Sequence, residues 1–131
     1  MGLDLTIYPL RDRRALSDQN PLCHERLNLD ADYQIFGQLI DMGDQLRSER
    51  PDIPKPTIRV YPLPPGMWIR VYEDEGIAQR HDDAYGEGLT FAYAGDMAKL
   101  SMPTDATAKN RAVKAFIDAL PEDTPIILFW H

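Results

Sequence analysis

The sequence predicts a single α+β domain in which a sheet of about five strands is covered by two helices. Its 131 residues suit one domain and are too few for two ordinary ones. Apolar residues alternate at strand spacing in several short segments, and they recur at helical spacing in two longer ones. The sequence has no internal repeat and no interdomain linker, so we expect residues 1–131 to form one globular unit.

The amino-terminal part of the chain contains one expected strand and one expected helix. Residues 3–8, "LDLTIY", alternate apolar and polar side chains and end at a proline, which is typical of a strand with one buried face. Residues 9–29 hold prolines and many charges, and we expect them to be irregular. Residues 30–49 carry apolar side chains at helical spacing, and the prolines of "RPDIPKP" end this helix.

The rest of the chain predicts four strands and a second helix. Residues 57–62 and 67–73 both alternate, and "PLPPG" between them supplies turn residues, so we expect these strands to form a hairpin. Residues 89–94 predict a further strand, and residues 105–120 predict the second helix. The final run "PIILFW", at 125–130, is apolar throughout, which is typical of a strand buried on both faces.

The expected order of elements is β-α-β-β-β-α-β. Apart from one additional strand, this order matches the split β-α-β pattern of ferredoxin-like folds. We therefore expect a two-layer sandwich, a variant of that fold, with a mixed or antiparallel sheet and both helices on one face.

The charge of the chain limits its partners. The 14 basic and 21 acidic residues give a net charge of −7, and phosphate backbones repel such a surface. The short basic patch "RDRR", at 11–14, is interpreted as a solvated loop. Direct binding to nucleic acid is therefore not expected.

The sequence also indicates the compartment. No apolar run approaches the roughly 18–20 residues of a membrane span. The first residues lack a basic segment, and Asp4 interrupts their apolar pattern, so they do not resemble a signal peptide. The single cysteine, Cys23, cannot form an internal disulfide. We expect a cytoplasmic protein that does not bind a membrane.

The strong signatures of catalysis and cofactor binding are absent from the sequence, which has no phosphate-binding loop, nucleophile elbow, H-E-x-x-H helix or paired C-x-x-C. No cofactor is therefore expected. The best candidate for catalysis is the loop 74–88, where His81 with Asp82, Asp83 or Glu87 suggests acid–base chemistry.

The same loop is the candidate metal site. Its carboxylates, together with His81 and with His24 or His131 from elsewhere, suggest a weak cation site centred on His81, Asp82 and Asp83. Its spacing does not match a calcium loop, and an acidic connection is more often simply solvated. A nucleophilic pair of Cys23 with His81 requires the fold to bring them together.

A second candidate surface lies on the expected hairpin. Trp68, Arg70 and Tyr72 share one strand face, and Arg59 and Tyr61 lie on the strand expected to pair with it. These residue types are enriched at binding hot spots. The alternative interpretation is that a further layer covers this face.

The opening "MGLDLTIYP" is similar to the openings of small phage and prophage proteins. The resemblance covers residues 1–9 and includes no catalytic motif, so it implies no activity.

The leading functional hypothesis is a small acidic protein that binds another protein with a basic surface, as an inhibitor, an immunity factor or a phage or prophage accessory factor. Glu73, Asp74 and Glu75 would complement the charge of that partner. Self-association through the hairpin as a homodimer is a further interpretation. The alternative function is a small metal-dependent or His/Asp acid–base hydrolase centred on residues 74–88. The sequence leaves open whether the chain is an enzyme and favours the view that it is not.

Overall fold

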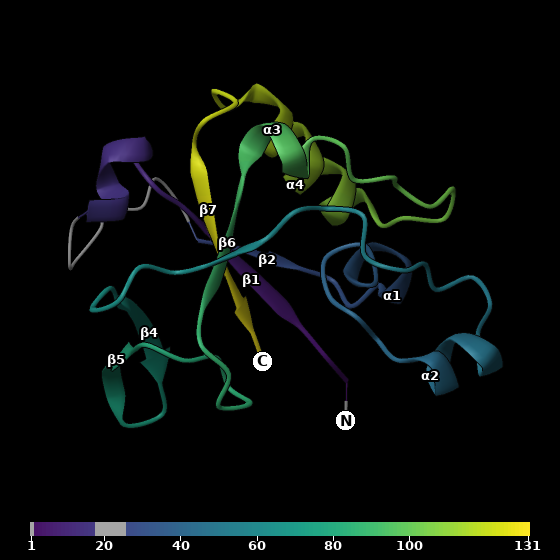
Figure 1. Ribbon diagram of the computed structural model, residues 1–131, viewed down its shortest axis with the longest axis horizontal. Helices are drawn as coiled ribbons and strands as arrows, with labels where there is room; N and C mark the ends of the chain where they lie inside the picture. The colour runs from purple at the N-terminus through teal and green to yellow at the C-terminus, as the bar shows by residue number, and fades with distance from the viewer. Residues whose placement is uncertain (1, 18–25) are drawn as a thin grey trace.

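The computed structural model describes residues 2–17 and 26–131, and its fold is α+β (Figure 1). Within these residues, a five-stranded antiparallel sheet has the order β2-β1-β7-β6-β3, and β4 and β5 form a separate hairpin. The strands are β1 (Leu5–Pro9), β2 (Leu27–Leu29), β3 (Tyr61–Pro62), β4 (Ile69–Glu73), β5 (Gly76–Arg80), β6 (Thr90–Tyr93) and β7 (Pro125–Trp130). The helices are the 3-10 helix η1 (Arg13–Ser17) and the α-helices α1 (Tyr33–Phe36), α2 (Asp44–Glu49), α3 (Ala94–Met97) and α4 (Ala108–Ala119).

Strand β7 lies between β1 and β6 and is buried along its whole length. Ile126, Leu128 and Trp130 belong to one apolar cluster, and Ile127 and Phe129 belong to another. Because successive side chains of a strand point to opposite faces, the two clusters lie on opposite faces of the sheet. The prediction of a strand buried on both faces is confirmed.

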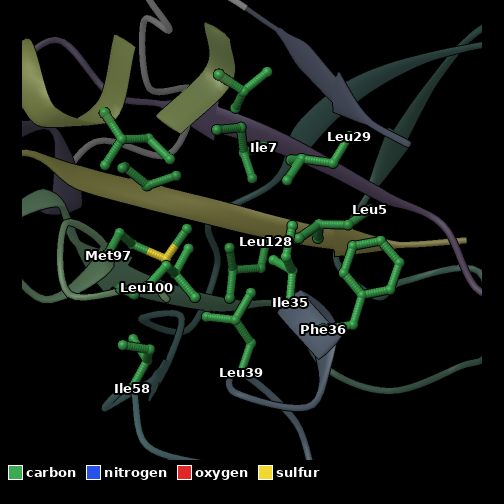
Figure 2. Packing of buried hydrophobic residues seen from close by; sticks show 14 of the residues in the cluster. Leu5, Ile7, Leu29, Ile35, Phe36, Leu39, Ile58, Met97, Leu100 and Leu128 are labelled. Atoms are coloured by element: carbon green, nitrogen blue, oxygen red, sulfur yellow. The ribbon is translucent and has the colours of Figure 1, made fainter. Parts of the chain in front are cut away.

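The first cluster lies between the sheet and the helices. Ile35 and Phe36 of α1 and Val113 and Ile117 of α4 are buried in it. Figure 2 shows Ile35 beside Leu128 and Phe36 beside Leu5. Helices on one face of a sheet are what the sequence predicted. No helix in the described part of the chain is long and apolar enough to cross a membrane.

The second cluster lies under the hairpin and η1. Met67 and Ile69 from the hairpin and Ala15 from η1 are buried together with Phe91 of β6 and Phe129 of β7. In Figure 1 the β4–β5 hairpin lies away from α3 and α4, with the sheet between them. The sandwich therefore has a further partial layer, which the sequence analysis did not predict.

The expected helix over residues 30–49 is wrong, because the structure breaks it into the short helices α1 and α2. The break is a turn in which the Asp41 carboxylate accepts a hydrogen bond from the Gly43 amide (2.9 Å), and Gly43 has φ of 93°. Arg47 donates to the same carboxylate (2.7 Å), and this hydrogen bond lowers the pKa of Asp41. Aspartate and glycine therefore form a turn inside a run of helical apolar spacing.

The expected hairpin of residues 57–62 with 67–73 is also wrong. Strand β3 pairs with β6 instead, and the Leu63 amide extends this pairing to the Leu89 carbonyl (2.9 Å). Strand β4 pairs with β5, which lies in the segment expected to be an irregular loop. Prolines in "PLPPG" have no N–H to donate to a ladder, whereas Gly76, with φ of 121°, closes the tighter turn after Asp74 and Glu75.

The ferredoxin-like order is not confirmed. The first and last strands, β1 and β7, are antiparallel neighbours in the middle of the sheet. Strand β2 follows β1 and pairs with it at the edge, although residues 9–29 were expected to contain no strand. A short edge strand of this kind has too few residues to give a clear alternating pattern.

The two buried faces of β7 can be tested separately. We expect Ile126→Ala and Ile127→Ala each to lower the free energy of unfolding by about 2–5 kcal/mol, because each leaves a cavity in a closed apolar cluster. Urea denaturation of both variants measures this. If Ile127→Ala costs less than about 1 kcal/mol, the cost of a surface change, the second face is open and the hairpin layer is wrong.

Candidate functional site

The β4–β5 hairpin presents one face to the sheet and the other to solvent. Met67 and Ile69 are buried against the sheet, whereas Trp68 between them is partly exposed and Arg70 is exposed. This alternation follows the strand period of two residues. The predicted orientations of Trp68 and Arg70, away from the core, agree with these exposures.

The solvent-facing side of the hairpin is formed by Trp68, Arg70, Ile77 and Gln79, which we call the outer hairpin face. Arg70 and Gln79 are directly opposite each other in the register, so their side chains share one face. Ile77 lies two residues before Gln79 and is 61% exposed. The Arg70 guanidinium carbon lies 5.7 Å from the centre of the Trp68 ring, within the range of a cation–π contact.

Three other residues predicted for this surface are placed differently or are not described. Arg59 is exposed on the segment before β3, and Tyr61 belongs to β3. The Tyr61 ring stacks on Phe91 with their centres 5.4 Å apart, in the second apolar cluster. The expectation that both residues lie on the strand paired with β4 is therefore wrong. The side chain of Tyr72 lies outside the described part of the structure.

The acidic residues divide between the two sides of the hairpin. Asp74 and Glu75 are exposed in the turn between β4 and β5. Glu73 belongs to the inner side, since the strand period places it on the same face as Ile69 and Val71, and its Oε1 lies 3.0 Å from Arg80 Nε. We call Asp74 and Glu75 the acidic tip.

The loop "RHDDAYGEG" is organised by Asp83, whose side chain the sequence analysis considered for catalysis. Asp83 is only 7% exposed, and its Oδ1 accepts hydrogen bonds from the amides of Tyr85 (2.8 Å) and Glu87 (3.1 Å). The Asp83 amide donates back to the Glu87 carbonyl (2.7 Å). This carboxylate closes a tight loop, in the way that aspartate side chains commonly do.

His81 points to the hairpin rather than to the acidic loop. Its Nδ1 lies 3.0 Å from the Met67 carbonyl oxygen. Within residues 2–17 and 26–131, no hydrogen bond or ion pair joins His81 to Asp82, Asp83 or Glu87. The hydrolase alternative stays a hypothesis, and this geometry does not supply the histidine–carboxylate pair that it requires.

The described part of the fold does not bring metal-ligating side chains together at the predicted metal site. The described residues contain no group of three histidine, cysteine, aspartate or glutamate side chains placed to hold a metal ion. Cys23 and His24 lie outside the described residues, so their relation to His81 stays a prediction.

No protein-family model matches this chain, and comparisons with curated proteins and with solved structures gave no match.

Ile77 is the residue that the sequence analysis missed on this surface. It was assigned to an acidic loop because charged residues surround it. A signal was nevertheless present: the turn sequence "DEG" directly follows the alternating segment 67–73. The residues after it, "IAQR", do not alternate between apolar and polar, so the turn alone indicates a strand that returns along β4.

The structural role of Asp83 predicts a difference between adjacent aspartates. We expect Asp83→Ala to destabilise the protein by about 1–3 kcal/mol, because the amides of Tyr85 and Glu87 lose their acceptor. The matched control is Asp82→Ala, which removes an exposed carboxylate and should change the stability by no more than about 0.5 kcal/mol. Urea denaturation compares them. Equal stability of the two variants would contradict the role assigned to Asp83.

Proposed function

We propose that this protein binds another protein, one with a basic surface, through the outer hairpin face and the acidic tip. The observation that carries the proposal is the exposure of Ile77, which lies on the same face as the Trp68–Arg70 pair. Isolated apolar residues are common on surfaces, but here an apolar residue, an indole ring and a guanidinium lie on one ribbon of two strands. That combination is typical of the centre of a protein–protein interface.

The energetics of this face favour binding over a structural role. The exposed Ile77 side chain adds little to the stability of the isolated fold, whereas its burial by a partner would release its apolar surface from water. The contact of Arg70 with Trp68 restricts both side chains before any partner arrives. Such restriction reduces the entropy lost when an interface forms.

The charge of the chain favours a basic partner. The net charge is −7, and Asp74 and Glu75 project at the end of the hairpin next to the outer face. A basic surface would be drawn to this end first, which would raise the association rate and orient the encounter. The roles that fit such a mode of action are those of an inhibitor, an immunity factor or a phage or prophage accessory factor, acting in the cytoplasm.

The proposal is tested first by capture and then with purified proteins. The tagged protein is used to recover partners from its native host at low and moderate salt, and the recovered protein is purified. We expect Ile77→Thr to weaken its affinity by about tenfold, because the substitution keeps a β-branched side chain but removes apolar area from the interface. Surface plasmon resonance measures the affinity, and a thermal melt checks that the stability is unchanged.

A charge swap with a matched control tests the acidic tip. We expect Asp74→Lys with Glu75→Lys to slow association by about tenfold at low salt, and the effect should shrink as salt is added. The control is Glu122→Lys with Asp123→Lys, an exposed acidic pair before β7 that gives the same change in net charge. The proposal fails if both double variants slow association equally, if Ile77→Thr leaves the affinity unchanged, or if the chain associates only with itself.

A further inference from the structure

A cleft of about 380 Å³ lies between the inner side of the hairpin and the β2-β1-β7 part of the sheet. Elsewhere the hairpin and the sheet meet through apolar side chains, whereas this cleft is lined largely by polar ones. The polar residues that line it are Thr6, Arg26, Asn28, Glu73, Arg80 and His131. The hairpin and the sheet thus face each other with polar groups on both sides of an open space.

The sheet side of the cleft is a fixed set of hydrogen-bonding groups. Thr6 Oγ1 donates to Asn28 Oδ1 (2.6 Å) and lies 2.8 Å from His131 Nε2. Because the single hydroxyl hydrogen is directed to Asn28, Thr6 accepts from His131, which places a proton on Nε2. The His131 ring also stacks on Phe129, with the centres 5.5 Å apart and the planes 23° apart. The orientation of the imidazole is therefore set before any ligand enters.

The hairpin side of the cleft supplies a guanidinium. Arg80 is directly opposite Ile69 in the register, so its side chain starts on the inner face. Glu73 Oε1 lies 3.0 Å from its Nε atom as an ion pair, but this buried Nε–H makes no hydrogen bond within the described part of the chain. Among the described residues, the terminal nitrogens of Arg80 make no hydrogen bond to a protein atom. The planar fork of arginine matches the oxygens of a carboxylate or a phosphate.

Stability does not explain this arrangement. The side chains of Glu73 and Arg80 remain 41% and 40% exposed, and an ion pair with that exposure contributes little to folding. Apolar side chains at these positions would continue the contact that Met67 and Ile69 already make with the sheet. Arg26 adds a second guanidinium, so two guanidinium groups and the Glu73 carboxylate line the cleft in a chain of net charge −7.

We infer that this cleft binds a small molecule through a carboxylate or phosphate group. Arg80 engages the oxygens of that group, and Thr6, Asn28 and His131 form the opposite wall. The cleft lies on the inner side of the hairpin, whereas the proposed protein-binding surface lies on the outer side. The inference therefore goes beyond the proposed function and does not depend on it.

The test is a titration followed by NMR, with inorganic phosphate and succinate as separate probes, at constant pH and at an ionic strength held constant with chloride. We expect at least one probe to give saturable shifts at Thr6 and His131. Arg80→Ala should weaken that binding at least about tenfold, because a charge-assisted contact is lost. The matched control is Arg14→Ala, an exposed arginine of η1 that does not line the cleft, which should leave the affinity within about twofold.

The two probes also distinguish the ligand class, since saturation by one alone assigns the cleft to phosphates or to carboxylates. If Arg80→Ala disturbs the methyl signals of Ile69, the Arg80→Lys variant is used in its place. This substitution keeps the positive charge but removes the planar guanidinium, and we expect it to weaken binding severalfold. The inference is overturned if neither probe saturates, or if Arg14→Ala weakens binding as much as the Arg80 variant does.

Discussion

The burial of β7 on both faces is the constraint on which the rest of the structure depends. The run "PIILFW" has no polar side chain to present to water, so each face of the sheet at this strand requires a cover. The helices cover one face, and the hairpin with η1 covers the other. A covering hairpin must be apolar on one side, and its other side then faces solvent. The outer hairpin face is the side of this hairpin that points away from the sheet. The polar cleft lies where its inner side and the sheet are not in apolar contact.

The strands with the strongest patterns could be predicted from sequence. Residues 125–130 form β7 with the expected bounds, and the expected strand over 89–94 contains β6. The helix over 30–49 failed because apolar spacing continues through Gly43, where the backbone turns. Periodicity reports which side chains are buried, and it does not report where the backbone changes direction.

Strand pairing was less predictable than strand position. The segment 67–73 has the alternation of a strand, and the structure confirms it as β4, but its partner follows it in the sequence instead of preceding it. Both candidate turns contain glycine, so turn chemistry alone did not decide between them. The residues of the cleft are harder still, because Thr6 and His131 meet only through the pairing of the first and last strands. No local pattern in the sequence links positions so far apart.

The candidate functional residues also differ in how far the sequence could place them. The placement of Trp68 and Arg70 away from the core follows from alternation within one strand, and the sequence was sufficient for it. Asp83 was considered a catalytic residue because it is a carboxylate beside a histidine, whereas its hydrogen bonds to the loop are visible only in three dimensions. A short polar motif does not distinguish a reacting group from one that holds its own loop together.

The central claim is that the hairpin packs on the second face of the sheet, and a measurement of proton–proton proximity tests it most directly. Methyl and aromatic NOEs are recorded on the wild-type protein in solution. We expect cross-peaks from the methyl groups of Ile69 and Val71 to Tyr8, Ile127 or Phe129, which lie in the second apolar cluster. If the NOEs of Ile69 and Val71 are confined to the hairpin itself, the hairpin does not cover the sheet and the account is contradicted.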